Sequence, residues 1–208
     1  MKSNIIIDKK YTDPILDWLL SNNNMETYLN FSPGHKGGKV IGRTNIDLLP
    51  KDLSDAEFPF KEYFSLCDKI KEIFGLPKDL PIEDNYGFLI AAFYEGHYTH
   101  PHKDPNVNDE GPDESKHEKV DDIYQLKDKI HCRLNILLQK PIRGGNPINN
   151  FVEIEVKENE PWMVLAGLYE HGSSVVEGDR TRIMLSFGHY LPIPLAIEKG
   201  WYNPKTHK

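Results

Sequence analysis

Two histidines and one aspartate in the second half of the chain have the types and spacing of a metal-ligand set. His102 and Asp104 are separated by one residue, and His171 follows later in Tyr169–Gly172. On an extended backbone alternate side chains face the same way, so His102 and Asp104 can reach one ion. Two histidines and one carboxylate form a facial triad, which leaves positions on iron(II) open for a cosubstrate and dioxygen. The sequence therefore predicts an iron site at these three residues.

Other histidines compete for this role, because the chain has nine. His97 and His100 lie close to His102, but neither has an acidic residue two positions later. A His-X-Asp pair also arises often by chance, and a single histidine is usually an ordinary surface or core residue. The assignment therefore depends on further features of the chain.

An arginine at the start of an apolar strand pattern can bind an anionic cosubstrate. Arg182 opens the run Ile183–Phe187 shortly after His171. A guanidinium that faces into a barrel is costly unless an anion pairs with it, and a dicarboxylate supplies that anion with bidentate geometry. Arg180 has the same strand parity and is a rival. The alternative for either residue is an ordinary surface arginine, which suits Arg180 better because it is nearer the Gly178-Asp179 turn.

A polar face lies along the strand pattern His131–Leu138. His131, Arg133 and Asn135 alternate with apolar residues, so one face of the strand is polar and the other is apolar. The polar face either meets solvent or lines a pocket inside a barrel. Alternation alone does not decide between these two arrangements.

Two helices are expected in the first part of the chain. Thr12-Asp13-Pro14 offers a capping side chain followed by proline, and Asn22–Asn24 ends the apolar stretch that follows. A second helix is predicted from about Phe60 to Phe74, because apolar residues recur there at helical spacing. Gly75 and Pro77 stop it, and the composition of Ser32–Gly38 indicates a loop.

After Pro81 the pattern changes to short strands separated by turns. Turn signals include Arg143–Pro147 and Glu177–Asp179. Helices followed by a series of strands predict a β-sandwich or barrel supported by helices. The predicted strands are Tyr86–Tyr94, His131–Leu138, Phe151–Val156, Trp162–Leu168 and Arg182–Phe187.

The length of 208 residues fits one domain. We expect a helical support region over 1–80, a β core over 81–191 and a C-terminal tail over 192–208. The polar, charge-rich segment Pro105–Lys129 interrupts the strands. It is either a disordered or mobile insertion or, because it directly follows the metal motif, an active-site lid.

Composition excludes several classes of protein. The net charge of -7 disfavours a nucleic acid partner. The apolar runs are too short to cross a membrane, and the N-terminus does not resemble a signal peptide. Cys67 and Cys132 lie in apolar patterns typical of core thiols in a reducing compartment. We therefore expect a cytoplasmic protein whose oligomeric state the sequence does not give.

From about Tyr86 to Leu191 the chain resembles the iron(II)/2-oxoglutarate-dependent oxygenase superfamily. Tyr94-Glu95-Gly96 is similar to the Tyr-X-X-Gly approach to the metal motif, with glycine one residue earlier. Pro141–Gly145 resembles the Gly-Gly turn between barrel strands. His171–Ser174 with Arg182 resembles the distal histidine and the 2-oxoglutarate arginine.

The resemblance implies a mainly β fold with flanking N-terminal helices, namely a double-stranded β-helix of the jelly-roll, cupin-like type. It implies iron(II), 2-oxoglutarate and O2 as cofactors, and His102, Asp104 and His171 as catalytic metal ligands. Arg133-Leu134-Asn135 and Pro141 also resemble the Arg-X-His strand of the aspartyl/asparaginyl β-hydroxylase branch, with Asn135 in place of histidine. The residues implied for the cofactor site are Arg182, Arg133, Asn135 and Tyr94.

The function expected from this resemblance is hydroxylation of an unactivated C–H bond, in an amino-acid side chain that is free or part of a peptide. One alternative is a cupin-like barrel with a different metal and no oxygenase activity. Another is a binding module whose histidines do no chemistry. Arg182 separates the oxygenase from the cupin, because a cupin hydrolase or isomerase has no use for a dicarboxylate clamp.

Overall fold

The computed structural model describes the backbone of residues 1–28, 30–31, 35–36, 39–43, 57–83, 87–104, 106 and 128–206, and the side chains among 1–26 and from residue 57 on. The helical elements are η1 (Lys9–Tyr11), α1 (Asp13–Leu20), α2 (Asn24–Tyr28), α4 (Phe60–Ile73) and α5 (Ile193–Glu198). The strands are β1 (Asn30–Phe31), β2 (His35–Lys36), β3 (Lys39–Arg43), β4 (Phe88–Phe93), β5 (Tyr98–Thr99), β6 (Lys129–Gln139), β7 (Arg143–Gly144), β8 (Pro147–Asn149), β9 (Val152–Glu153), β10 (Pro161–Val164), β11 (His171–Ser173), β12 (Val176–Glu177) and β13 (Arg182–Pro192).

The largest layer is a six-stranded antiparallel sheet with the strand order β1-β3-β4-β13-β6-β10. The two longest strands, β6 and β13, pair along most of their length at its centre. The chain therefore brings its last long strand between two earlier ones, which places Arg182 opposite Phe93 of β4.

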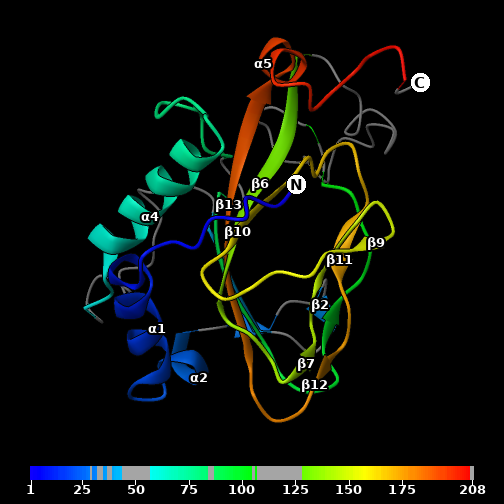
Figure 1. Cartoon of the computed structure of the whole chain (residues 1–208). Coiled ribbons are helices and arrows are strands. Elements are labelled where there is room, and N and C mark those ends of the chain that lie inside the picture. Colours follow the sequence, from blue (N-terminus) through cyan, green and yellow to red (C-terminus); the bar gives the residue numbers. More distant parts are fainter. Residues whose placement is uncertain are drawn as a thin grey trace, which may run out of the picture.

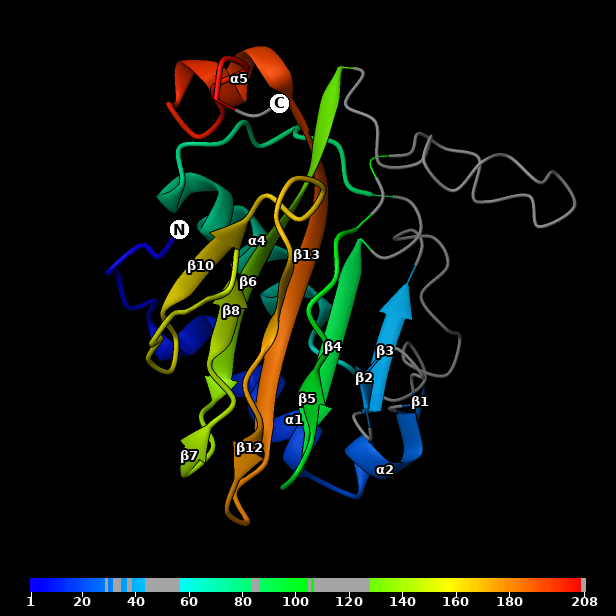
Figure 2. The ribbon, with the colours of Figure 1, turned by 90° about the vertical axis from the view of Figure 1, so that its right-hand side faces the viewer.

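Short strands form a second layer that faces the large sheet. They pair as β11-β8-β9, β12-β7 and β2-β5, and an isolated bridge between His102 and His171 connects the segment after β5 to β11. Helices α1 and α4 lie on one side of the large sheet and the short strands on the other (Figure 1). The view in Figure 2 shows the strands of the two layers running along a common direction.

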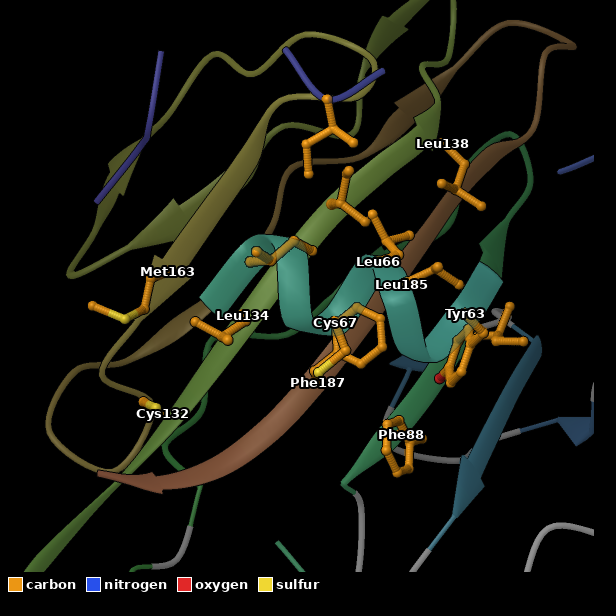
Figure 3. Close-up of a cluster of buried hydrophobic side chains, with 14 of the residues drawn as sticks. Tyr63, Leu66, Cys67, Phe88, Cys132, Leu134, Leu138, Met163, Leu185 and Phe187 are labelled. Atoms are coloured by element: carbon orange, nitrogen blue, oxygen red, sulfur yellow. The ribbon is translucent and has the colours of Figure 1, made fainter. Parts of the chain in front are cut away.

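Side chains of the central strands alternate between two buried regions, one under the helices and one between the two layers of strands. On β13, Ile183, Leu185 and Phe187 belong to the cluster packed against the helices, and on β6 the even-numbered apolar residues do the same. Tyr63 of α4 contacts Phe88 and Phe187, with ring centroids 5.4 and 5.1 Å apart. Figure 3 shows α4 lying across this face of the sheet.

The odd-numbered residues of β6 face the other interior, between the two layers. His131, Arg133 and Asn135 are all buried, so the polar face of this strand lines the inside of the barrel and does not meet solvent. This observation decides the question that alternation left open.

Some segments differ from expectation. Only Val152–Glu153 of the predicted strand 151–156 is a strand, because Asn150 and Phe151 form a tight turn with positive φ angles of 48° and 63°. The predicted strand 162–168 ends at Val164, where turn hydrogen bonds to the carbonyl of Leu165 begin. The C-terminal tail contains helix α5.

Two further expectations concern loops. His35–Lys36, inside the predicted loop 32–38, forms strand β2. The predicted mobile insertion or lid over 105–129 falls, apart from Asn106, Asp128 and Lys129, outside the described residues.

Both cysteines are free and buried, and burial raises the pKa of Cys67 and of Cys132 to about 12. They are core thiols, as the sequence predicted. Within the described part of the chain, no helix has the length and apolar character needed to cross a membrane.

We predict that Phe187→Ala lowers the free energy of unfolding by about 3–5 kcal/mol, because it empties the centre of the aromatic cluster under α4. Urea unfolding measures the change. Ile197→Ala, at an exposed position of α5, should stay within about 0.5 kcal/mol of the wild type. Equal losses in the two variants would contradict the assignment of the core.

Candidate metal centre

The structure brings His102, Asp104 and His171 together. Their ligand atoms all lie within 4.8 Å of one another, and they form the one such group among the described residues. The Nε2 atom of His102 lies 3.4 Å from Oδ1 of Asp104, and Nε2 of His171 lies 3.8 Å from Oδ2. Ligands at adjacent positions around one ion lie about 3 Å apart, so a small inward movement accommodates a metal.

Backbone pairing fixes this cluster. His102 and His171 exchange two hydrogen bonds, in which each N–H donates to the other's carbonyl at 3.0 and 2.8 Å. Directly opposed residues of an antiparallel pair project from the same face, so both imidazoles lie on one face, where the carboxylate of Asp104 meets them. The amide of Asp104 donates to the carbonyl of Ala166 at 2.9 Å, which anchors the third residue to the segment that follows β10.

Each imidazole of the cluster is oriented through its second nitrogen. Nδ1 of His102 lies 2.8 Å from the carbonyl oxygen of His100, and Nδ1 of His171 lies 3.4 Å from that of Tyr169. When Nδ1–H donates to these carbonyls, the lone pair of Nε2 is directed at the cluster. Such outer hydrogen bonds are a regular feature of metal-ligating histidines.

The carboxylate of Asp104 is held by a buried guanidinium. Nε of Arg133 donates to Oδ2 of Asp104 at 2.7 Å. Glu83 also approaches Arg133, with Oε2 3.8 Å from Nη2, and Nδ1 of His131 lies 3.3 Å from Oδ2 of Asp104. Asp104 is only 8% exposed, so this group of charges lies almost entirely out of water.

The pKa values follow from these contacts. Burial alone would raise the pKa of Asp104, but the charge of Arg133 and the hydrogen bond with His102 hold it well below its usual range. Burial lowers the pKa of His171 to about 4 and outweighs the opposing effect of Asp104. Burial also lowers the pKa of His102, but the hydrogen bonds with Asp104 and the His100 carbonyl outweigh it and raise the pKa above the ordinary value. At neutral pH the site therefore offers an ionised carboxylate and a neutral His171.

A second functional feature of the interior is Arg182, which is 2% exposed. Its Nε and Nη1 atoms have no hydrogen-bond partner among the described residues, and burial lowers its pKa to about 10. Its guanidinium carbon lies 5.1 Å from the centre of the Phe93 ring. A buried cation without an anionic partner is costly, so the position fits an anionic ligand.

The Gly144-Gly145 turn makes room for this arginine. Both glycines have positive φ angles, of 65° and 62°. A Cβ on Gly145 would lie 2.9 Å from Cδ of Arg182, and one on Gly144 would lie 1.9 Å from the carbonyl oxygen of Val175. Only glycine satisfies the backbone conformation and the close approach together.

The other three residues predicted for the cofactor site, unlike Arg182, have their polar groups hydrogen-bonded or paired within the protein. The amide of Asn135 donates to the carbonyl of Arg133 and is buried inside the barrel. Arg133 contacts Asp104 and Glu83, so its guanidinium is already engaged. The hydroxyl of Tyr94 donates to Glu26 at 2.9 Å, so the structure does not bring it to the metal cluster.

The rival residues also lie elsewhere. Nδ1 of His97 accepts a hydrogen bond from the amide of Tyr94, and the ring of His100 packs on Tyr98. Arg180 is half exposed and pairs with Glu158 at 2.8 Å. Of the two arginines considered for an anionic cosubstrate, Arg182 is the buried one.

Sequence reasoning missed two residues that support the site. The side chain of Asn106 donates to the carbonyl of Gly167 and accepts from the amide of His131, which ties the metal loop to β6. Glu83 reaches Arg133 and His131 from a segment far earlier in the chain. The position of Asn106 two residues after Asp104 was a usable signal, whereas nothing in the sequence marks Glu83.

Comparison with known proteins identifies the fold. No protein-family model matches the chain, and no curated protein matches it in sequence. The structure is similar to a Pseudomonas putida prolyl-4-hydroxylase, with a TM-score of 0.51 and 14% identity over 86% of each chain. It is also similar to a Trichoplax adhaerens prolyl hydroxylase in complex with a peptide fragment of the hypoxia inducible factor oxygen degradation domain. That likeness has a TM-score of 0.53 and 16% identity, and covers 93% of this chain and 86% of the other.

These likenesses confirm the predicted fold class, a double-stranded β-helix with flanking helices, which is the fold of the oxygenase superfamily. Neither neighbour is named as an aspartyl/asparaginyl hydroxylase, so resemblance to that branch stays a prediction.

We predict that iron(II) affinity rises with pH about tenfold per unit until His102 has lost its proton, and then levels off. The raised pKa of His102 means that the metal must displace a proton from it near neutral pH. His171, with a pKa of about 4, adds no such competition there. Anaerobic titration with iron(II) at several pH values measures the profile, and a flat profile between about pH 5 and pH 8 would contradict it.

We predict that Arg133→Met lowers the free energy of unfolding at neutral pH by about 3–5 kcal/mol, because it leaves the carboxylate of Asp104 buried without its cation. In the wild type this contribution is present above the unfolded pKa of Asp104 and is lost as the pH falls through its lowered folded pKa. Arg143→Met, which breaks an exposed pair with Glu177, is the control and should cost at most about 1 kcal/mol. Urea unfolding of both variants is measured at neutral pH and at a pH low enough to protonate Asp104. The loss in Arg133→Met should be large at neutral pH and smaller at low pH.

Proposed function

We propose that this protein is an iron(II)- and 2-oxoglutarate-dependent dioxygenase that hydroxylates an unactivated C–H bond of an amino-acid side chain, free or in a peptide. The observation that carries the proposal is the guanidinium of Arg182, whose Nε and Nη1 atoms are buried without a hydrogen-bond partner among the described residues, in the same barrel as the His102–Asp104–His171 cluster. A metal cluster alone is compatible with many reactions. A buried cation that lacks an anion points to a cosubstrate with a carboxylate.

The residues fit both groups. Two imidazoles and one carboxylate suit iron(II) and leave positions free for a chelating keto acid and dioxygen. The guanidinium of Arg182 suits the far carboxylate of 2-oxoglutarate through bidentate hydrogen bonds. When bound, iron(II) and 2-oxoglutarate supply the oxidation, in which one oxygen atom of O2 enters the C–H bond and the other enters succinate as CO2 leaves.

The protein's own residues position and shield this chemistry. Arg133 holds Asp104 ionised, and the carbonyls of His100 and Tyr169 keep both imidazoles turned toward the ion. Apolar side chains, including Phe93 and Val176, form a cluster on the interior side of β4 beside Arg182. They exclude water there, which strengthens the pairing of Arg182 with an anion.

The alternative is a cupin-like metal-binding barrel without 2-oxoglutarate oxygenase activity. Such a barrel accounts for the cluster at His102 but gives no reason to bury Arg182 unpaired. The oxygenase therefore explains one more feature of the interior than the cupin does.

Partners and location follow as further parts of the proposal. The complex of the Trichoplax adhaerens neighbour with a peptide supports a peptide or small-molecule substrate, and the net charge of -7 argues against nucleic acid. Two buried free thiols support a reducing compartment, which we propose is the cytoplasm.

We predict that Arg182→Met raises the KM for 2-oxoglutarate roughly 30- to 900-fold, corresponding to about 2–4 kcal/mol of lost binding. Iron affinity should change little. Because methionine removes a buried charge that has no anionic partner among the residues the structure describes, the unliganded variant should also unfold at higher urea concentration than the wild type. Succinate release and urea unfolding measure the two effects.

The control for this variant is Arg180→Met, which removes a half-exposed arginine paired with Glu158. It should keep the wild-type KM. A raised KM for 2-oxoglutarate in Arg180→Met, with the wild-type KM in Arg182→Met, would assign the cosubstrate carboxylate to Arg180 instead. Absence of any succinate formation by the iron-loaded wild type with every substrate class tried would favour the cupin-like barrel.

A further inference from the structure

A row of three side chains crosses the inner face of the smaller layer. His102 bridges to His171, and His171 is the register partner of Asn149 on β8. Opposed residues in antiparallel strands project from the same face with Cβ atoms about 5 Å apart. Since both imidazoles point to Asp104, Asn149 lies next in line on the metal-binding face.

The amide oxygen of Asn149 has no partner in the described part of the chain. Oδ1 is buried and accepts no hydrogen bond from any described residue. A buried carbonyl oxygen without a donor is costly, and an amide oxygen can only accept. The position therefore favours a ligand that places an N–H or O–H donor at Asn149, directly beside His171.

The hairpin that carries Asn149 ends in an exposed apolar tip. Asn150 and Phe151 both have positive φ angles, and the side chains of Phe151 and Val152 are 74% and 63% exposed. A left-handed conformation is common for asparagine but costly for phenylalanine, and glycine is the usual residue at the second position of such a turn. Strain of this kind persists mainly where a side chain has a function.

The hairpin is firmly attached beside the metal centre. The amide of Asn150 donates to the carbonyl of Glu170 at 2.7 Å, directly before His171. At its base, Oε1 of Glu153 accepts from Asn146 at 2.7 Å and from Ser174 at 3.2 Å. The exposed tip is therefore held in place relative to the cluster.

We propose that the β8–β9 hairpin is the substrate platform of this site and that the substrate is a peptide segment. Asn149 accepts a hydrogen bond from a backbone N–H of the peptide beside the residue to be oxidised. Phe151 and Val152 pack against an apolar side chain further along. The inference rests on the proposed oxygenase function and narrows its substrate class.

The spacing argues for a peptide and against a free amino acid. His171, Asn149 and Val152 are successive register partners across β11, β8 and β9, so their Cβ atoms form one row about 10 Å long. An extended chain advances by about 3.3–3.6 Å per residue, so a ligand that reaches from the metal ligands to Val152 spans about three residues. A free amino acid reaches either the metal ligands or the exposed tip, but not both.

The first experiment supplies the iron-loaded protein and 2-oxoglutarate with pools of short blocked peptides, one pool for each central residue type, and in parallel with the free amino acids. Products are detected as peptides heavier by one oxygen atom, together with succinate. Oxidation in one or more peptide pools, exceeding that of the corresponding free amino acid, is the expected result. Oxidation of free amino acids alone overturns the peptide inference and leaves the oxygenase function standing.

The second experiment tests Asn149 on the best peptide. Asn149→Leu, of similar size but without an acceptor, should lower kcat/KM about tenfold. Methylating the backbone nitrogens beside the target residue should lower the wild-type value by a similar factor and barely affect the variant. Equal sensitivity of wild type and variant to methylation means that Asn149 has only a structural role, and overturns its assignment. Iron content is measured on the same samples.

The third experiment uses Phe151→Gly. Glycine adopts the positive φ without strain, so the variant should unfold at higher urea concentration while the KM for the peptide rises severalfold. Leu20→Ala, which removes an exposed apolar side chain from α1 on the opposite side of the large sheet, is the control and should leave the KM unchanged. A Phe151→Gly variant with wild-type KM would overturn the role of the tip. Failure of the wild type to release succinate with any peptide or amino acid would instead remove the proposed oxygenase function itself.

Discussion

The buried ion pair between Arg133 and Asp104 is the interaction on which the arrangement of the metal centre depends. It joins the segment after β5 to the central strand β6 through a 2.7 Å contact that is nearly free of solvent. Removing either partner would leave a charge in a low-dielectric interior, so the two segments must stay together. Asp104 is thereby held ionised beside His102 and His171, in the state that a divalent cation requires.

The same strands serve a stable core and a polar interior. Even-numbered residues of β6 pack under α4, while His131, Arg133 and Asn135 line the barrel. The helical side is apolar and well packed, and it supplies the stability. The barrel side keeps polar groups without partners among the described residues, at Arg182, Ser186 and Asn149. Such groups reduce the stability of the unliganded protein.

Much of the fold could be predicted because its signals are local. Helix α4 and strand β13 begin within a residue of the predicted positions, since apolar spacing and turn residues act over a few positions. The predicted strand 151–156 is shorter in the structure, where only Val152–Glu153 is a strand, and its start is displaced for a local reason as well. A two-residue turn with positive φ angles at Asn150 and Phe151 carries no glycine to mark it.

The sequence by itself determined which residues are candidates to bind a metal and an anion. The His-X-Asp spacing, the later histidine and the arginine at the start of an apolar strand can all be recognised from the order of residues alone. It could not decide which face of β6 is inside, which of Arg180 and Arg182 is buried, or that Glu83 lies beside Arg133 and Asn149 beside His171. Those facts arise when strands distant in the chain pair in one register, since register alone sets which side chains share a face. Tertiary structure therefore decided the surroundings of the three predicted metal ligands, and it buried Nε and Nη1 of Arg182 and Oδ1 of Asn149 without hydrogen-bond partners among the described residues.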